Sequence, residues 1–116
     1  MNDAVAVGLT HTDSYTVTDD MSPAHLPTKV LSTPDMIQLI EKTCLEAVQP
    51  HLDEGRTTVG IHVCVSHAAS VDSGQRVDVR CELTEIDRKR LVFTTTVTSG
   101  DTTVSEGTHQ RFVVGG

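Results

Sequence analysis

The stretch PDMIQLIEKTCLEAV, residues 34–48, decides the fold of this chain of 116 residues. Its apolar residues recur at intervals of three and four, which is the period of an amphipathic helix with one buried face. They are Met36, Ile37, Leu39, Ile40, Cys44, Leu45 and Val48. Pro34 suits the first helical position, and either Ser32 or Thr33 suits the N-cap. The sequence therefore predicts one helix from Pro34 to Val48.

Five runs with strand character flank this helix. One precedes it at residues 12–18, and four follow it, at about residues 57–70, 76–87, 89–99 and 102–114. Turn signals separate the last four runs, which predicts an antiparallel meander with one face packed on a helix. This order predicts an α+β hotdog fold, in which a five-stranded antiparallel sheet wraps one long central helix. Because so small a core often gains from pairing with a second copy, we expect a homodimer.

Length, charge and cysteine count limit the classes of partner. A chain of this length predicts one domain, spanning residues 1–116. Its 16 acidic residues against 9 Lys and Arg leave a net charge of −7, which argues against nucleic acid or an anionic membrane as the partner. Three cysteines without a C-x-x-C pair predict free thiols in a reducing compartment. No basic leader or long apolar run occurs, so we expect a cytoplasmic protein.

Three polar residues occupy positions that an ordinary core would not give them. Thr33 lies at the start of the helix, Glu41 lies on its apolar stripe, and His67 continues an apolar row of a predicted strand. A carboxylate or imidazole buried without a partner costs about 2 kcal/mol or more. The ordinary alternatives are an N-cap for Thr33, a border position reaching water for Glu41, and a satisfied core residue for His67. Because Glu41 on the helix and His67 on the strand that it covers are both predicted to point inward, a functional site is favoured over these alternatives.

From about residue 31 to residue 114 the chain resembles the small family of hotdog acyl-CoA thioesterases that includes fluoroacetyl-CoA thioesterase. The resemblance rests on Thr33 followed eight residues later by Glu41, on the run VGIHVCVSHAA at residues 59–69, and on GTHQR at residues 107–111. It implies an enzyme that hydrolyses a short or medium acyl-CoA thioester to the free acid and CoA. The fluoroacetyl-selective member has phenylalanines in the loop before its threonine, whereas residues 19–32 here contain no aromatic residue. We therefore expect a different short or medium acyl group.

The same resemblance implies roles for five residues. Thr33, Glu41 and His67 are the implied catalytic constellation, and we expect them to meet at one cavity between two protomers. Thioester hydrolysis needs an oxygen nucleophile, a base and donors to an oxyanion. Either Thr33 or Glu41 attacks the carbonyl, or a water does so, with His67 as the base. Gly60 and Arg111 are implied to lie near the substrate, although a glycine in mid-strand equally suits packing against the helix. Arg111 then pairs with Glu41 or a CoA phosphate, unless it is a solvated edge residue.

No metal or cofactor site is predicted. His62 and His67 are five residues apart on one predicted strand and therefore point to opposite faces. No zinc spacing, P-loop or dinucleotide fingerprint occurs in the sequence. His11, His25 and His51 lie in predicted loops or turns and are expected to be exposed.

Two other functions fit the same architecture. One is a hotdog hydratase or dehydratase acting on an enoyl-CoA. Such enzymes keep a histidine and an aspartate in one segment, but Asp35 has no histidine near it in the sequence. The other is a noncatalytic module that binds an acyl group or another small molecule, in which Glu41 and His67 only satisfy each other.

Overall fold

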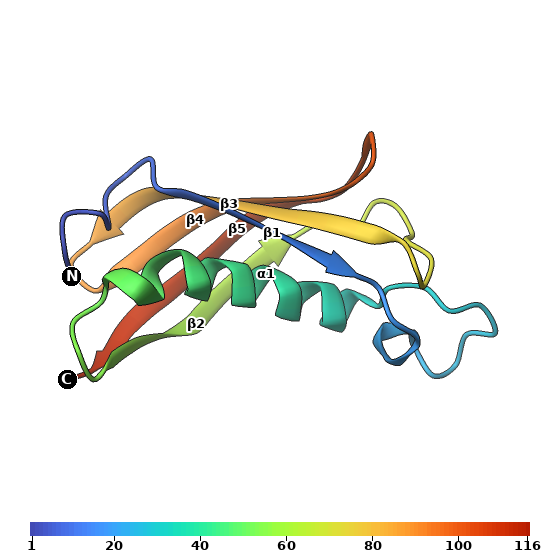
Figure 1. The fold of residues 1–116 in the computed structure, drawn as a ribbon, viewed down its shortest axis with the longest axis horizontal. Helices are drawn as coiled ribbons and strands as arrows, with labels where there is room; N and C mark the ends of the chain where they lie inside the picture. Colours follow the sequence, from blue (N-terminus) through green and yellow to red (C-terminus); the bar gives the residue numbers. More distant parts are fainter.

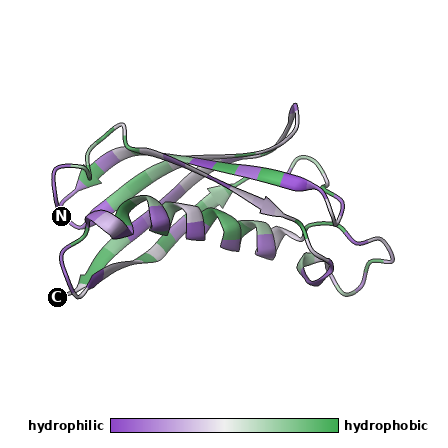
Figure 2. Ribbon diagram, in the orientation of Figure 1, coloured by the Kyte–Doolittle hydropathy of each residue, from purple (hydrophilic) through white to green (hydrophobic).

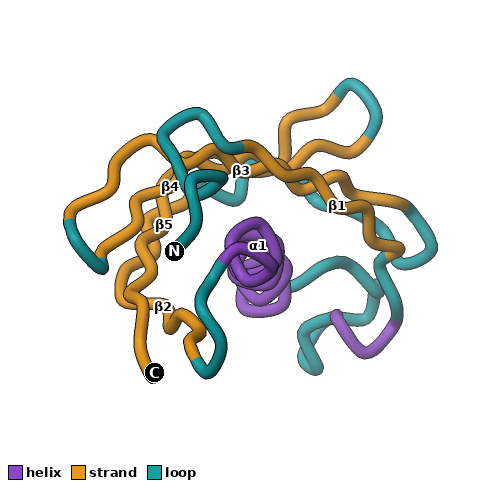
Figure 3. The backbone as a smooth tube through the Cα atoms, turned by 60° about the vertical axis from the view of Figure 1, so that its left-hand side comes forward, coloured by secondary structure: helices purple, strands orange, loops and turns teal.

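A curved antiparallel sheet of five strands wraps one long helix in the computed structural model, which describes residues 1–116 (Figure 1). The strands are β1 (Thr10–Thr16), β2 (Arg56–Val65), β3 (Arg76–Asp87), β4 (Arg90–Ser99) and β5 (Thr102–Gly115). The helix is α1 (Thr33–Val48), and two short 3-10 turns, η1 (Asp19–Met21) and η2 (Gln49–His51), lie in the connections. Viewed along the helix, the sheet curls around α1 and leaves one side of it open (Figure 3). The structure confirms the predicted α+β hotdog fold.

The start of α1 is set by Ser32. Its hydroxyl accepts a hydrogen bond from the backbone N–H of Asp35 at 3.1 Å, so Ser32 is the N-cap. Thr33 is therefore the first helical residue, one position before the predicted start, and its own hydroxyl is not used in capping. The predicted end at Val48 is confirmed.

Alternation on two central strands builds the other side of the core. On β3 the fully or almost fully buried residues are Val77, Val79, Cys81 and Leu83, and on β4 they are Leu91, Phe93, Thr95 and Val97. Hydrophilic and hydrophobic positions alternate along β3, as Figure 2 shows. All of these buried residues except the polar Thr95 pack with the buried face of α1 into one apolar cluster. The period-two pattern in the sequence predicted this face correctly.

The position of β2 differs from the predicted meander. The strand order is β1-β3-β4-β5-β2, so β3, β4 and β5 form the meander while β2 pairs with β5. β1 and β2 are consequently the two edge strands. β2 also ends at Val65, five residues before the predicted limit, and His67 follows the strand instead of belonging to it.

A bulge in β2 overturns the predicted apolar row of this strand. The register with β5 shifts between Gly60 and His62, which leaves Ile61 as an extra residue. Before the bulge Thr58 pairs with buried Val113 and faces α1, and after it the inward residues are Val63 and Val65. Val59 and Ile61, predicted to be buried, are 45% and 49% exposed. One inserted residue exchanges the two faces of the strand.

Two further observations concern covalent and membrane chemistry. All three cysteines are free, with Cys44 and Cys81 buried and Cys64 exposed. The structure thus agrees with the prediction of unpaired thiols. α1 is too short and too polar to cross a membrane, and the structure contains no other helix that could do so.

The apolar face of α1 should carry much of the stability. Ile40 is completely buried, whereas Gln38, two residues earlier, is exposed. We expect Ile40→Ala to lower the free energy of unfolding by about 2 to 5 kcal/mol, because it removes buried methyl groups and leaves a cavity. Gln38→Ala should change it by no more than about 0.5 kcal/mol. Urea denaturation followed by circular dichroism measures both, and equal effects of the two substitutions would contradict this account of the core.

Candidate active site

A hydroxyl and an imidazole meet at the beginning of α1. Thr33 Oγ1 lies 2.8 Å from His67 Nδ1. The segment that carries His67 is held beside β5 by two backbone hydrogen bonds, from Ser66 N–H to the Glu106 carbonyl and from Ala68 N–H to the Val104 carbonyl. Because Ser32 caps the helix, the Thr33 hydroxyl is available for this contact. The sequence therefore identified a real pair, although it placed His67 on a strand.

A hollow of about 340 Å³ opens beside this pair and includes both residues in its lining. The other lining residues are Pro23, Leu26, Val30, Leu31, Ser32, Ala68, Ala69 and Ser70. They come from the loop before α1 and from the segment after β2. The apolar part of the lining is wholly aliphatic, so the hollow suits an aliphatic group beside the hydroxyl and imidazole.

A second polar group surrounds Glu41 farther along α1. Arg111 Nη1 lies 3.9 Å from Glu41 Oε2, and the Arg111 side chain is only 6% exposed. Arg111 donates from Nε to Thr58 Oγ1 at 2.7 Å and from Nη2 to the Thr58 carbonyl at 3.0 Å. Burial lowers the pKa of Arg111, and the Glu41 carboxylate opposes that shift. The structure thus contradicts the solvated alternative for Arg111, and its burial also disfavours contact with a CoA phosphate.

Gly60 lies where this group is most crowded. A Cβ atom on Gly60 would stand 3.2 Å from His109 Cε1 and 3.4 Å from both Arg111 Nη1 and Glu41 Cδ. A side chain here would press on all three groups, so the glycine leaves space at the carboxylate and guanidinium. Gly60 and Arg111 therefore belong to one cluster with Glu41.

Within one chain the three predicted catalytic residues form two separate groups. Thr33 and Glu41 are eight residues apart on α1, which corresponds to a rise of about 12 Å. The hydroxyl and imidazole pair is therefore well separated from the carboxylate. None of the three predicted catalytic side chains is fully buried, because Glu41 is 42% exposed, Thr33 is exposed and His67 is half-buried. The border position for Glu41, left open by the sequence, is the observed one.

His109 is the site neighbour that the sequence analysis did not select. Its side chain is completely buried on β5. Nδ1 lies 2.8 Å from the His62 carbonyl oxygen, and Nε2 lies 3.1 Å from Arg111 Nη1. Burial lowers the pKa of His109, and the Arg111 charge lowers it further. A signal was present, because His109 and Arg111 alternate with outward residues on the same strand face as apolar Val113.

Another polar cluster lies between β1 and α1. His11, which the sequence placed in a loop, is on β1, where Nε2 lies 3.0 Å from Asp13 Oδ2 and 3.9 Å from Glu46 Oε2. The two carboxyls interact, which lowers the pKa of Asp13 and raises that of Glu46. The three ligand atoms lie within 4.8 Å of one another, so these are the residues that could share a cation. The contacts within the cluster and its partial exposure account for it without one.

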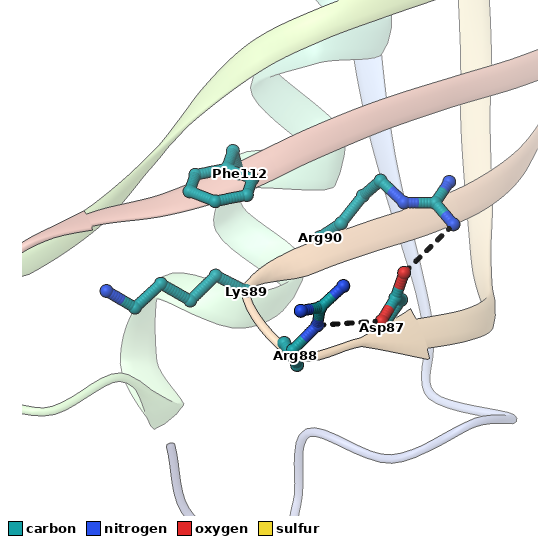
Figure 4. Close-up of a pocket in the computed structure, with 5 residues that line it drawn as sticks. All are labelled: Asp87, Arg88, Lys89, Arg90 and Phe112. Carbon is teal, nitrogen blue, oxygen red and sulfur yellow. Dashed lines mark hydrogen bonds and ion pairs between the residues drawn. The ribbon is translucent and has the colours of Figure 1, made fainter.

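A larger hollow, of about 460 Å³, lies at the turn between β3 and β4 (Figure 4). It is lined by Asp87, Arg88, Lys89, Arg90 and Phe112. Asp87 pairs with Arg88 at 3.2 Å and with Arg90 at 3.6 Å, and these ion pairs are largely exposed. The lining lacks a hydroxyl, an imidazole and a cysteine. The smaller hollow beside Thr33 and His67 is therefore the better candidate for the chemistry.

Comparisons with known proteins agree on one family. The family model described as fluoroacetyl-CoA-specific thioesterase matches residues 11–116. The fluoroacetyl-CoA thioesterase of Streptantibioticus cattleyicolor is 29% identical over 123 residues, which cover 98% of this chain and 88% of that protein. A solved structure of a fluoroacetyl-CoA thioesterase superposes with a TM-score of 0.91 at 29% identity, covering 97% of this chain and 90% of that one.

Two further structures extend the comparison. A mutant of a fluoroacetyl-CoA-specific thioesterase, solved with fluoroacetate and CoA, has a TM-score of 0.90 at 28% identity and covers 95% of both chains. A Thermus thermophilus protein described as a thioesterase superfamily member has a TM-score of 0.89 at 19% identity, covering 98% of this chain and 87% of that one. The latter match is evidence for the fold alone.

The lowered pKa of His109 predicts a pH dependence of stability. The ordinary histidine pKa is about 6.5, so the unfolded chain takes up this proton at a higher pH than the folded chain. The stability that the neutral ring contributes is fully present above about pH 6.5 and is lost as the pH falls below that value toward the folded pKa. We expect His109→Gln to remove this component from the free energy of unfolding.

Urea denaturation at a series of pH values from about 5 to 8 measures it, as the difference between wild type and variant. His25→Gln, at an exposed loop position, is the matched control. Parallel curves for wild type and His109→Gln over this range would show that the ring does not contribute in this way.

Proposed function

The chain belongs to the fluoroacetyl-CoA-specific thioesterase family, and from this membership and the geometry of the site we propose that it hydrolyses a short or medium acyl-CoA thioester to the free acid and CoA. The observation that carries the proposal is the contact of 2.8 Å between Thr33 Oγ1 and His67 Nδ1 beside an aliphatic hollow. General-base catalysis at a carbonyl requires a hydroxyl within hydrogen-bond distance of an imidazole, as these two side chains are.

Thr33 also offers a donor to the oxyanion. In the first turn of α1, Asp35 N–H bonds the Ser32 hydroxyl, Met36 N–H bonds the Ser32 carbonyl, and Pro34 has no N–H. The backbone N–H of Thr33 has no partner in the chain and lies beside the hydroxyl. A carbonyl oxygen bound at this N–H would be stabilised as its negative charge develops. The attacking oxygen then comes from Thr33, from a water held by it, or from Glu41.

The separation of the two polar groups supports a homodimer with composite active sites. We propose that Thr33 and His67 of one protomer face Glu41 and Arg111 of its partner. Apolar surface near Glu41 supports this pairing, because Ile37 and Leu45 are only half-buried on the same stripe of α1. The edge strand β2, on which Val59 and Ile61 are exposed, borders the open side of the helix (Figure 3).

The aliphatic lining supports a substrate outside the fluoroacetyl group. Leu26, Val30 and Leu31 form the apolar wall of the hollow, and no aromatic ring contributes to it. Such a wall excludes water from an alkyl chain without contacting fluorine specifically. Free thiols on all three cysteines support a reducing compartment, and we propose the cytoplasm.

Release of thiol from a panel of acyl-CoAs tests the activity. The panel contains acetyl-, fluoroacetyl-, butyryl- and hexanoyl-CoA, and we expect turnover without preference for the fluorinated substrate. Thr33→Ala, Glu41→Gln and His67→Ala should each lower kcat/KM about 100-fold or more while circular dichroism stays unchanged. His51→Ala, outside both groups, is the control. Absence of thiol release from every substrate by the folded protein would refute the proposal, and water addition to an enoyl-CoA would identify a hydratase.

Mixed dimers test the composite site. Thr33→Ala and Glu41→Gln chains carrying different tags are coexpressed and compared with each variant alone. If the site joins two protomers, half of the dimers are mixed and each contains one intact site, so the mixture should recover about one quarter of the wild-type rate. Purified mixed dimers without activity would show that all three residues act within one chain.

A further inference from the structure

His109 is buried with both ring nitrogens engaged by groups of opposite hydrogen-bonding character. The His62 carbonyl, 2.8 Å from Nδ1, can only accept, so Nδ1 carries a hydrogen. The Arg111 guanidinium, 3.1 Å from Nε2, can only donate, so Nε2 presents its lone pair. The contacts together define a neutral imidazole with the proton on Nδ1. A protonated ring would bring an N–H and a second positive charge against Arg111.

The carbonyl that orients this ring follows directly after the bulge in β2. The register with β5 shifts between Gly60 and His62, and Val63 is the direct partner of His109. The bulge therefore lies between the residue that leaves space at the site and the residue whose carbonyl sets the tautomer. A β-bulge in this position redirects backbone groups toward a site.

His109 completes the fixation of Arg111. Both hydrogen bonds to Thr58 come from Nε and Nη2, which lie on one edge of the guanidinium. Neither bond contacts Nη1. The bond to His109 holds Nη1 directly, and Nη1 is the nitrogen that lies 3.9 Å from Glu41 Oε2. The hydrogen bond to His109 thus helps to fix the position of the Arg111 charge relative to the Glu41 carboxylate.

The neutrality of the acceptor matters for the site. A carboxylate in the position of His109 would bind the guanidinium but would also cancel its charge. An imidazole without charge holds the same nitrogen and leaves the positive charge to act on Glu41. No other carboxylate is paired with Arg111 in the structure.

We propose that His109 is a positioning residue of the thioesterase site, which holds Arg111 Nη1 beside Glu41 as a neutral hydrogen-bond acceptor. This inference rests on the proposed function. His109 has no role in proton transfer, because both of its nitrogens are occupied inside the protein. Its contribution is to fix the electrostatic surroundings of Glu41, and its loss should lower kcat more than it changes KM.

Two substitutions of similar size separate this role from simple filling of the core. His109→Gln retains an acceptor for Arg111, whereas His109→Leu removes it. We expect His109→Leu to lower kcat roughly 10- to 100-fold with KM changed less than about threefold, and His109→Gln to recover the rate to within about threefold of wild type. His51→Gln and His51→Leu are the matched controls. Equal losses in the two His109 variants would overturn the proposal.

Nitrogen NMR of histidine-labelled wild-type protein tests the same contact without activity. We expect one ring with Nδ1 protonated and Nε2 unprotonated, unchanged between about pH 6.5 and 8, and absent in His109→Gln. The Arg111 Nη1–H resonances should be protected from exchange in wild type and lose protection in His109→Leu, while the Nε–H bonded to Thr58 stays protected in both. A His109 ring protonated on Nε2 would overturn the proposal. If wild type releases no thiol but these signals are as expected, the thioesterase function fails while the positioning contact stands.

Discussion

Burial of one face of α1 against the concave side of the sheet is the constraint on which the rest of the molecule depends. Met36, Ile40 and Cys44 are completely buried on that face, which fixes the rotation of the helix about its axis. Once Ile40 points into the sheet, Glu41 must lie about 100° around the helix, at the border of the buried face. Thr33 lies within about 20° of Ile40 around the axis, so it is exposed because it stands in the first turn of α1 and not because of this rotation. The half-exposed carboxylate is thus a consequence of how the core packs.

The edge strand β2 and its bulge bring the polar residues of the site to the buried side of the sheet. β2 pairs on one side only, so an extra residue can be accommodated there without breaking a second ladder. With the bulge at Ile61, Thr58 and Gly60 face the helix, and Gly60 lies opposite Arg111 of β5. Thr58 then receives Arg111, and Gly60 leaves room for its guanidinium. Val59 and Ile61, which are lost from the inner face, are exposed on this edge strand.

Charge within the site is balanced locally although the chain carries a net charge of −7. Arg111 is nearly buried and donates hydrogen bonds to the uncharged side chains of Thr58 and His109. Glu41 is its only anionic neighbour within ion-pair distance. A buried cation held by neutral acceptors keeps a strong field in the direction of its one counter-ion. Because this pair is separated from Thr33 and His67, neither of the two groups in one chain contains the hydroxyl, the imidazole and the carboxylate together.

Local pattern determined much of this protein from its sequence alone. The spacing of Met36 to Val48 predicted α1, the alternation on β3 and β4 predicted their inner faces, and family resemblance singled out Thr33, Glu41 and His67. Tertiary structure alone decided that β2 lies beside β5, that Ile61 is a bulge, and that His109 and Arg111 are buried together. The physical reason is that helix and strand periodicity depends on residues close together in the sequence. Strand order, register and the burial of polar groups depend on partners distant in the chain.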